Sequence, residues 1–479
     1  MRIVIDNLHC KNYFSAQDHT HGVDFTTELR EYMKVRANGY QFSPLFKQGK
    51  WGGYSHFYTK TDKYATGFLS MVYAKIKELA PDIEITLEDR RTNVPVFREE
   101  LTDVLPNTTD RLRDYQMEGI RSIVGNTIQI GDTHLHFQRG IYDSATNSGK
   151  STVMAGLAAN MVNPSLLILI DRVAIFKDLV KSFRALFGPL VGQIGGGVEQ
   201  FAPITICMAQ TLKGKLGSIN TLAELAKFDM VIVDEGHKAA NDTYKDILSH
   251  VKAASRLIMS GSPLDMDNKA TKMTLVGMFG KPLVKVTNKQ MIAAGVSQRP
   301  TVHIHLIDDP NIKAAYAWAD EAAAFHQSPV LAAKLAELAA DGEQTLATYS
   351  IISHGERLQR AVPGSTLTHG KDPDRDKALS DFVEGKTNCL IASMILKEGV
   401  NIPNIRRLVR CEGGKSDITT KQVVGRALRN DGVHSTVEVH DFYIKGKASE
   451  KHSRLRLAAY EREGFEIVYY YAHKKGRPL

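Results

Sequence analysis

One short stretch combines small residues, a lysine and hydroxyl groups at a spacing that suits a polyphosphate. It consists of Ser144, Ala145, Thr146, Asn147, Ser148, Gly149, Lys150 and Ser151. Backbone N–H groups of such a loop can surround phosphate oxygens, while Lys150 reaches the β- and γ-phosphates and the Ser151 hydroxyl ligates Mg²⁺. These residues predict a nucleoside triphosphate site. The alternative is a polar surface turn that contains a lysine by chance.

The loop departs from the usual glycine-rich pattern at two positions. Ser144 stands where the first glycine is usual, and Asn147 occupies another position that is often glycine. Asparagine is the non-glycine residue that best accepts a positive φ, so the loop can keep its shape. Residues 152–161 are rich in alanine and lack proline. They predict a helix whose positive dipole end faces the phosphates.

A pair of carboxylates follows an apolar run about 84 residues after Lys150. Asp234 and Glu235 come directly after residues 230–233, which have the composition of a buried strand. Asp234 is expected to hold Mg²⁺ through water, and Glu235 to orient or deprotonate the attacking water, because in-line phosphoryl transfer needs a positioned nucleophile. Lys150 and Glu235 are therefore the predicted catalytic residues, with ATP and Mg²⁺ as cofactors.

Alternating strands and helices must position these residues from about residue 105 onward. Continuous apolar runs at residues 166–170 and 230–233 are typical of strands buried on both faces of a parallel sheet. A second α/β set is expected after residue 300, and the chain around residues 281–299 is expected to be a linker. Its predicted strands are residues 302–307, 345–348, 389–392, 408–410 and 465–471, and its predicted helices are residues 331–340, 374–383 and 450–463.

Residues 1–95 are predicted to form a separate small α+β domain, with strands at 1–7 and 83–87 and helices at 25–35 and 67–79. Basic and aromatic side chains alternate within it: residues 30–63 carry seven Lys or Arg against two Asp or Glu. Basic groups neutralise phosphates and aromatic faces stack on bases, so Lys47, Lys50 and Trp51 are predicted DNA contacts. The alternative is that the aromatics form the core. They are Tyr32, Tyr40, Phe42, Phe46, Trp51, Tyr54, Phe57 and Tyr58.

Length and composition indicate a globular protein of several domains, with 479 residues and 43% hydrophobic content. A net charge of +8 favours a polyanionic partner. The four cysteines are scattered, so neither disulfides nor a zinc site is expected. No apolar run reaches 18 residues and no signal peptide is recognisable. We therefore expect a cytoplasmic protein without a membrane segment.

Further segments resemble the motifs of superfamily-two helicases and follow in that family's order. Residues 113–116 resemble the Q motif, which implies that Gln116 reads the adenine. Residues 169–176 and 208–212 resemble motifs Ia and Ic, which implies contacts of Arg172, Gln210 and Thr211 with the nucleic-acid backbone. Residues 260–263 resemble motif III. The resemblance also implies a set of residues that couple ATP hydrolysis to the movement of the lobes. They are His237, Ser260, Gly261, Ser262 and Gln422.

Three further motifs resemble those of the family's second lobe. Residues 347–357 resemble motif IV. Residues 393–403 resemble motif V, which implies a DNA contact by Ser393 and nucleotide contacts by Gly399 and Asn401, the latter standing where the family often has aspartate. Residues 422–429 resemble motif VI, with Arg426 and Arg429 as arginine fingers that reach the γ-phosphate when the lobes close. The implied fold is α/β, with two RecA-like lobes in tandem at residues 96–290 and 291–479.

Within the superfamily, residues 37–44 with Phe46, Gly49 and Trp51 resemble the N-terminal domain of phage recombination helicases of the UvsW type. This resemblance implies a monomeric, ATP-dependent helicase that acts on branched DNA in recombination, replication and repair. The implied reactions are fork regression, Holliday junction branch migration and the unwinding of D- and R-loops. Two alternatives remain: a translocase on double-stranded DNA that does not separate strands, and a DNA- or RNA-binding protein whose ATPase has decayed.

One segment ahead of the phosphate loop carries no motif. Residues 126–139 predict a hairpin that turns at Gly131 and Asp132. The simplest interpretation is a surface hairpin without a functional role.

Overall fold

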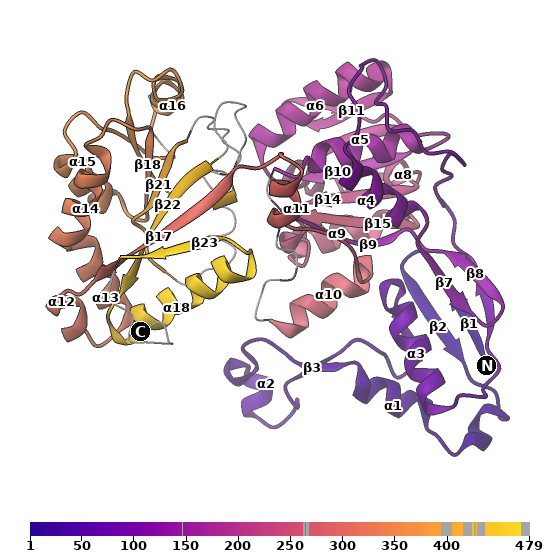
Figure 1. The fold of residues 1–479 in the computed structure, drawn as a ribbon. Coiled ribbons are helices and arrows are strands. Elements are labelled where there is room, and N and C mark those ends of the chain that lie inside the picture. Colours follow the sequence, from indigo (N-terminus) through magenta and orange to yellow (C-terminus); the bar gives the residue numbers. More distant parts are fainter. Residues whose placement is uncertain are drawn as a thin grey trace. The chain divides into compact units, whose positions relative to one another are not determined.

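The computed structural model describes residues 1–145, 147–261, 264, 268–370, 372–393, 405–414, 424–425, 428 and 436–470. The chain divides into two compact units, residues 1–144 with 149–285 and residues 145–148 with 286–479. Each unit contains a large, mainly parallel sheet with helices on its faces (Figure 1). Within the described part of the chain, no helix is long and apolar enough to cross a membrane.

The N-terminal part of the first unit is a four-stranded mixed sheet covered by helices. The consecutive apolar residues Ile3, Val4 and Ile5 of β1 are all buried, and Phe25 and Leu29 of helix α1 lie in the same apolar cluster as Ile3 and Ile5. The predicted α+β domain is therefore present, although the predicted helix at 25–35 ends early and the chain continues into β3. The elements are β1 Arg2–Ile5, β2 His9–Tyr13, η1 Asp18–His21, α1 Phe25–Tyr32, β3 Lys34–Arg36, η2 Tyr40–Phe42, α2 Pro44–Lys47, β4 Tyr54–His56, β5 Lys63–Ala65, η3 Thr66–Phe68, α3 Leu69–Leu79 and β6 Thr86–Asp89.

The hairpin at residues 126–139 exists and completes the core of this N-terminal part. Its strands are β7 (Thr127–Ile130) and β8 (Thr133–His136). Ile130, Leu135 and Phe137 are buried in the same apolar cluster as β1, α1 and α3. The hairpin thus has a packing role that its sequence did not indicate.

Polar and close backbone contacts also join the N-terminal part to the large sheet of the first unit. The Arg139 guanidinium is buried and donates to the carbonyl of Asn7 at 2.9 Å and to that of Met278 at 3.0 Å. Gly67 lies so close to α10 (Lys269–Phe279) that a Cβ at this position would overlap the Val276 carbonyl oxygen. The N-terminal part is therefore packed firmly on this lobe.

The large sheet of the first unit has the strand order β12-β11-β13-β10-β14-β15-β9-β16. Neighbours from β11 to β9 are parallel, and β12 is antiparallel to β11. Residues 282–286, expected in the linker, form β16 at the edge of this sheet. The strands are β9 Arg139–Ser144, β10 Leu166–Ile170, β11 Val191–Gly195, β12 Val198–Gln200, β13 Ile204–Met208, β14 Met230–Asp234, β15 Ser255–Ser260 and β16 Pro282–Val286.

Helices on both faces of this sheet bury an apolar core that includes every residue of β10, β13 and β14. They confirm the helix predicted at residues 152–161. Besides α10 they are α4 Asp114–Val124, α5 Lys150–Asn160, α6 Val173–Phe187, η4 Gly188–Leu190, α7 Ala209–Lys213, α8 Ile219–Leu225, η5 Gly236–Lys238 and α9 Asp242–His250.

The second unit has a sheet of strand order β19-β20-β18-β21-β22-β17-β23, with every neighbouring pair parallel. The strands predicted after residue 300 and the three helices predicted with them are present. The strands are β17 Arg299–Ile307, β18 Thr345–Tyr349, β19 Thr366–Thr368, β20 Cys389–Ser393, β21 Arg407–Arg410, β22 Thr436–Ile444 and β23 Glu466–Tyr469. The helices are α11 Asn288–Ala293, α12 Pro310–Ala314, α13 Trp318–Gln327, α14 Pro329–Ala339, α15 Ile352–Ala361, α16 Arg375–Val383 and α18 Lys447–Arg462.

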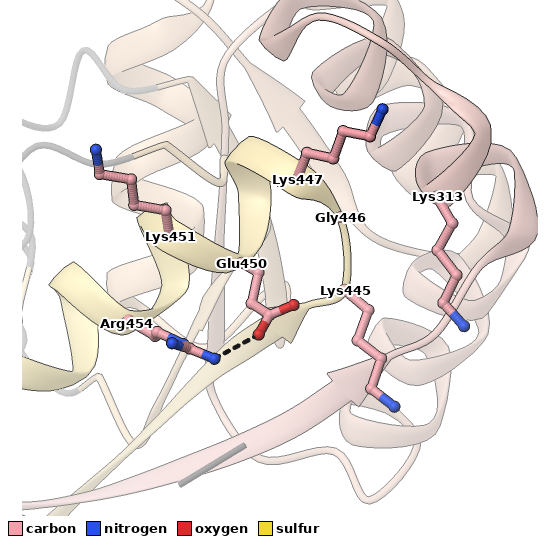
Figure 2. A pocket seen from close by; sticks show the side chains of 7 residues that line it. All are labelled: Lys313, Lys445, Gly446, Lys447, Glu450, Lys451 and Arg454. Atoms are coloured by element: carbon pink, nitrogen blue, oxygen red, sulfur yellow. Dashed lines mark hydrogen bonds and ion pairs between the residues drawn. The ribbon is translucent and has the colours of Figure 1, made fainter.

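The turns that follow β17 and β22 frame a basic opening with a volume of about 520 Å³ (Figure 2). Lysines from α12, from the turn after β22 and from α18 line it. Because β17 and β22 are parallel neighbours, their carboxyl ends bring these segments together.

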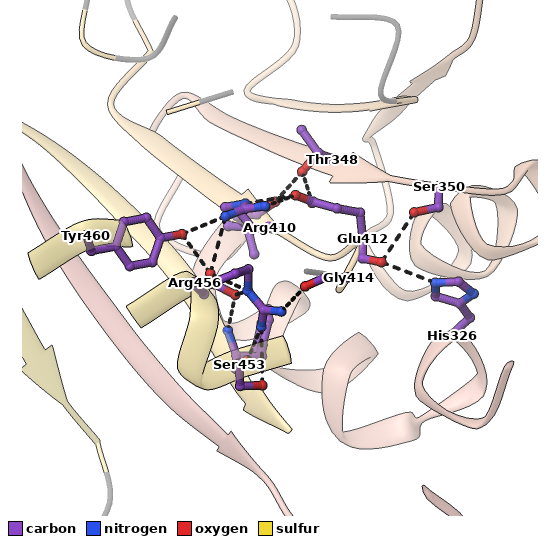
Figure 3. Close-up of polar contacts among 12 residues, drawn as sticks. His326, Thr348, Ser350, Arg410, Glu412, Gly414, Ser453, Arg456 and Tyr460 are labelled. Carbon is purple, nitrogen blue, oxygen red and sulfur yellow. Dashed lines mark hydrogen bonds and ion pairs between the residues drawn. The ribbon is translucent and has the colours of Figure 1, made fainter. Parts of the chain in front are cut away.

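A buried polar network lies between the ends of β21 and β22 and helix α18 (Figure 3). Asp441 accepts hydrogen bonds from Arg456 Nε at 3.0 Å and from the Tyr460 hydroxyl at 2.7 Å. Arg410 donates to Glu412 at 2.8 Å and to the Tyr460 hydroxyl at 2.7 Å. All five side chains are nearly inaccessible to solvent, so each buried charge is compensated by a partner within the lobe.

Candidate functional site

Three neighbouring strands of the first unit end at one edge of the sheet, in the order β14, β15, β9. In the parallel register Asp143 pairs with Ser260, and Met259 pairs with Asp234. The end of β9 at Ser144, the carboxylate pair at the end of β14 and the end of β15 at Ser260 are therefore adjacent. Ligands bind at this edge of open parallel sheets, at the carboxyl ends of the strands.

The phosphate loop has the backbone that its sequence predicts. Asn147 has a φ of +70°, which confirms that asparagine occupies a left-handed position here. Gly149 has a φ of +76°, and a Cβ there would overlap the Gln116 side-chain amide. Ser144 is the buried last residue of β9, and the Ser148 N–H donates to the Ala145 carbonyl at 3.2 Å.

Helix α5 begins at Lys150 directly after this loop. Gly156 in its middle faces Ile120 and Leu112, so α5 and α4 can approach closely. Gln116, in the first turn of α4, is buried, and its carbonyl oxygen accepts the Arg113 N–H at 2.9 Å. This bond holds the Gln116 side chain beside Gly149.

Asp234 is a buried carboxylate that is only partly compensated. It is 8% exposed, and its Oδ1 has no hydrogen-bond partner among the residues that the structure describes. Burial raises the pKa of Asp234 to about 6. The charge of Lys150 lowers this pKa, that of Glu235 raises it, and that of Arg172 lowers it. A buried carboxylate oxygen that has no donor in the described part of the chain, near Lys150 at the start of the helix that carries Ser151, fits a bound Mg²⁺.

Glu235 is held in an unusual backbone conformation directly after β14. Its φ and ψ are 50° and 48°, the left-handed region that non-glycine residues rarely adopt. A Cβ on the next residue, Gly236, would overlap Ile258 of β15, so this position requires glycine. The turn brings Glu235 Oε2 within 3.5 Å of the Ser260 hydroxyl, which donates to it. His237 follows in η5, and its side chain lies outside the described residues.

Sequence reasoning missed three side chains near the acid pair. Lys238 forms an ion pair with Asp171, which follows β10. Tyr244 of α9 is buried, and its hydroxyl has no hydrogen-bond partner within the described ranges. Burial raises the pKa of Tyr244, and the charges of Asp171, Asp234 and Glu235 raise it further. The only sequence signal was the position of Asp171 directly after a predicted strand.

The predicted DNA contacts of the two lobes occupy different environments. Arg172 precedes α6 and is close enough to affect the pKa of Asp234, so it lies toward the acid pair. Gln210 and Thr211 are exposed in the first turn of α7. Ser393 is the last residue of β20 and is nearly buried. Their roles toward DNA remain predictions.

The basic and aromatic segment of residues 30–63 divides into core and surface. Tyr58 is fully buried and Phe57 packs against the core, whereas Phe42 is 73% exposed. Arg36 lies over the rings of Tyr40 and Tyr54, at 4.7 and 4.1 Å from their centroids. Cation–π contacts thus explain part of the alternation of basic and aromatic residues.

Three residues of this segment were predicted to contact DNA. Lys47 and Lys50 are exposed. Trp51 is half-buried, and its indole N–H donates to the Tyr54 carbonyl at 2.9 Å. Trp51 is therefore compatible both with a contact to DNA and with packing inside the domain.

Several predicted site residues lie outside the described part of the chain. They are Thr146 of the phosphate loop, Ser262 of the third motif, and Gly399, Asn401, Gln422, Arg426 and Arg429 of the second unit. Gly261 directly follows β15 and is half-buried.

Three family profiles match the chain in sequence order. They are the N-terminal domain of DNA helicase UvsW at residues 7–86, the res subunit of type III restriction enzymes at residues 109–265, and the helicase conserved C-terminal domain at residues 334–431. Together they cover most of the N-terminal part and a portion of each large sheet.

Individual relatives match over most of their length. The ATP-dependent DNA helicase uvsW of Enterobacteria phage T4 is 23% identical, over 94% of this chain and 93% of the relative. The DNA 3'-5' translocase XPB2 of Sulfurisphaera tokodaii is 22% identical, over 72% of this chain and 84% of the relative. Among solved structures, a fragment of a putative HsdR subunit of a type I restriction enzyme from Vibrio vulnificus shares the fold, with a TM-score of 0.54 and 19% identity over 74% of this chain and 68% of the other.

The fold predicted from the sequence, two tandem α/β lobes behind a small N-terminal domain, agrees with these matches. Within the first unit, Ser144 at the end of β9, the carboxylate pair and Ser260 meet at one sheet edge. The helicase profiles and the relative that matches over 94% of this chain show that the protein is an ATP-dependent helicase similar to the UvsW-like members of superfamily two.

Proposed function

We propose that this helicase couples ATP hydrolysis to the remodelling of branched DNA, by fork regression, Holliday junction branch migration and the unwinding of D- and R-loops. The proposed ATP hydrolysis is supported above all by the buried Asp234 oxygen, which has no donor in the described residues and lies near Lys150. The match of residues 7–86 to the UvsW N-terminal domain supports the DNA half. We further propose a monomer that acts in recombination, replication and repair in the cytoplasm of a host cell.

In this proposal the residues of the first lobe have distinct roles at the nucleoside triphosphate. The backbone of residues 144–149 and the Lys150 ammonium bind the phosphates, and Gln116 contacts the adenine. Ser151 and Asp234 would hold Mg²⁺, which supplies charge neutralisation on the phosphates. Glu235 Oε2 orients the attacking water and accepts its proton, and the Ser260 hydroxyl steadies that carboxylate.

The second lobe is proposed to complete the nucleotide site. Gly399, Asn401, Arg426 and Arg429 would contact the nucleotide, and the two arginines would stabilise charge that develops on the γ-phosphate. Five residues would couple ATP hydrolysis to the movement of the lobes: His237, Ser260, Gly261, Ser262 and Gln422. We propose domain limits at residues 1–95, 96–290 and 291–479.

DNA is proposed to contact both lobes and the N-terminal domain. Arg172, Gln210, Thr211 and Ser393 would hold the backbone. The exposure of Lys47 and Lys50 supports a further contact by the N-terminal domain. Trp51 would stack on an unpaired base at a junction.

The test is a steady-state ATPase assay with single-stranded, duplex, forked and four-way DNA. We expect the largest stimulation by branched DNA, the loss of turnover in Lys150→Ala, and a decrease of about 10³–10⁵-fold in Arg429→Ala. Lys245→Ala, an exposed lysine on α9, is the control. Turnover that no DNA stimulates, or wild-type turnover in Lys150→Ala, would refute the proposal.

A second candidate function is translocation on duplex DNA without strand separation. It is favoured by the match to a protein named as a DNA 3'-5' translocase. Displacement of a triplex-forming strand from intact duplex, together with no release of the strand annealed at a fork, would establish this alternative. Release of the annealed strand would support the helicase.

Trp51 tests the N-terminal domain by a point substitution. Deletion of residues 1–95 is unsuitable, because it would expose Leu135 and Phe137 of the hairpin and leave Arg139 without its Asn7 partner. Trp51→Ala should weaken binding to forks more than binding to plain duplex in fluorescence anisotropy. An equal loss on all DNA forms with a lower melting temperature would show that the ring is only packed, at a cost of roughly 3–5 kcal/mol.

A further inference from the structure

The basic opening of the second unit has no role in the nucleotide site or in any helicase motif described above. Its charges come from three separate segments that meet at the carboxyl ends of β17 and β22. Figure 2 shows the side chains of Lys313 and Lys445 reaching toward the same side, and Lys447 and Lys451 extending from the first turns of α18. The lining side chains that carry charge are Lys313, Lys445, Lys447, Glu450, Lys451 and Arg454.

Local acids neutralise only part of this charge. Asp308 pairs with Lys313 and, at 3.2 Å, with Lys445. Glu450 pairs with Arg454 at 2.7 Å. Neither Lys447 nor Lys451 has an acidic partner among the described residues, so two ammonium groups remain uncompensated at the opening.

The helix terminus itself is already occupied by a protein group. The buried carboxylate of Glu321 accepts the N–H groups of Ala448 and Ser449, at 3.0 and 2.7 Å. A Cβ on Gly446 would lie 2.7 Å from the same carboxylate, so the residue that precedes α18 must be glycine. The attraction for an anion therefore comes from the lysine side chains and not from the helix dipole.

An exposed aromatic ring borders the lysines. Tyr316, between α12 and α13, is 89% exposed, and the Lys447 ammonium lies 4.8 Å from its ring centroid. A tyrosine so exposed next to lysines is typical of surfaces that contact nucleic-acid sugars and bases while the lysines neutralise phosphates.

The opening also lies on the edge of the sheet that carries the fourth and fifth motifs. The parallel register places the carboxyl ends of β20, β18, β21, β22 and β17 along one edge. With about 4.8 Å between strands, the distance from Ser393 at the end of β20 to the end of β17 is roughly 19 Å. A nucleic-acid strand held at Ser393 can reach the lysines within a few nucleotides.

We propose that Lys447, Lys451 and Tyr316, with Lys313 and Lys445 behind them, bind the phosphate backbone of a DNA strand and extend the DNA contact of the second lobe beyond its helicase motifs. This inference rests on the proposed DNA-dependent function. This contact surface would increase the affinity for DNA and would not contact ATP.

The test compares two double variants of the full chain. Lys447→Ala with Lys451→Ala removes the uncompensated charges, and Lys386→Ala with Arg406→Ala removes two charges that precede β20 and β21 at the opposite edge of the same sheet. Binding of single-stranded, duplex and forked oligonucleotides is measured by anisotropy at several salt concentrations. Tyr316→Ala is measured in the same series.

In the first double variant we expect the slope of log K against log salt to become shallower by about 1.4 for single strands or about 1.8 for duplex, because two phosphate contacts are lost. The form of DNA on which the slope changes identifies the strand that is bound. Tyr316→Ala should weaken binding with little change in slope. The melting temperature should stay unchanged in all variants.

An unchanged slope in Lys447→Ala with Lys451→Ala would overturn the inference, and so would an equal change in the control pair. Failure of the proposed function would give a different result, because no form of DNA would then stimulate ATP turnover by the wild-type protein. That result does not depend on the salt dependence of binding.

Discussion

Two buried aspartates, one in each large sheet, differ in how their charge is compensated. Asp441 is 3% exposed, and hydrogen bonds from Arg456 and Tyr460 together with the charge of Arg410 surround it. Asp234 is 8% exposed and keeps one oxygen without a donor among the described residues.

Their pKa values diverge accordingly. Burial raises the pKa of Asp441, but the charges of Arg456 and Arg410 and the hydrogen bonds outweigh it, so this pKa lies below its usual value. Burial dominates at Asp234 and raises its pKa to about 6. A charge that the fold satisfies stabilises the lobe, whereas a charge that it leaves unsatisfied costs stability and is available to a ligand.

Substitution of Glu235, the neighbour of Asp234, is expected to lower turnover strongly. Glu235→Gln should lower ATP turnover by about 10²–10⁴-fold, because the amide cannot accept a proton from the attacking water. ATP and Mg²⁺ binding should persist, since the charge of Asp234 is retained. Turnover and nucleotide binding are measured on the same preparation. Glu224→Gln, an exposed acid near the end of α8, is the control, and normal turnover in Glu235→Gln would remove Glu235 from the role of base.

Asp441→Asn breaks the compensated site. We expect a loss of about 3–5 kcal/mol in the free energy of unfolding, because Arg410 and Arg456 would remain charged and buried without their partner. Since the pKa of Asp441 is lowered by folding, this stabilisation is present above the unfolded value of about 3.9 and is lost as pH falls through the folded pKa. Chemical denaturation at pH 7 measures it, with Asp381→Asn as control, because this aspartate of α16 is only partly buried and its lysine partners are exposed. Equal stability of the two variants would contradict the comparison.

Asp234→Asn should act in the opposite direction. Because the folded pKa is raised to about 6, the ionised carboxylate costs stability above pH 6 and costs nothing below about pH 4. The nucleotide-free variant should therefore be more stable than wild type at pH 7.5, by on the order of 3 kcal/mol, and should melt a few degrees higher. This gain should disappear in acid, and ATP turnover should be lost at every pH. A lower melting temperature at pH 7.5 would show that Asp234 has a partner that compensates it.

Ser260→Ala is the smallest of these changes. It removes one hydrogen bond to Glu235, which is worth about 0.5–1.5 kcal/mol, so turnover should fall roughly 2–10-fold with KM for ATP unchanged. Ser255→Ala at the start of the same strand should affect stability alone, because its hydroxyl donates to the Gln138 carbonyl. A rise in KM without a fall in kcat would place Ser260 in nucleotide binding instead of positioning Glu235.

The amino-acid sequence by itself determined the local features. The apolar runs of β10 and β14 specify buried parallel strands, and Asn147 and Gly149 in the loop before α5 adopt the positive φ that their residue types accept. The order of the helicase motifs is likewise contained in the sequence. These features depend on neighbours a few residues apart.

Tertiary structure decided what depends on distant partners. The hairpin at residues 126–139 has the pattern of a surface hairpin, but its apolar face is buried against β1 and α3. Gly236 is required only because Ile258 of the next strand lies against it. Asp234 and Asp441 both lie in largely apolar strands. A second carboxylate follows Asp234 and not Asp441, but this local difference does not show which of the two charges the fold compensates. Arg410, Arg456 and Tyr460 reach Asp441 from other elements, whereas no side chain among the described residues donates to Asp234 Oδ1. The packing of the chain therefore decided which aspartate the fold compensates.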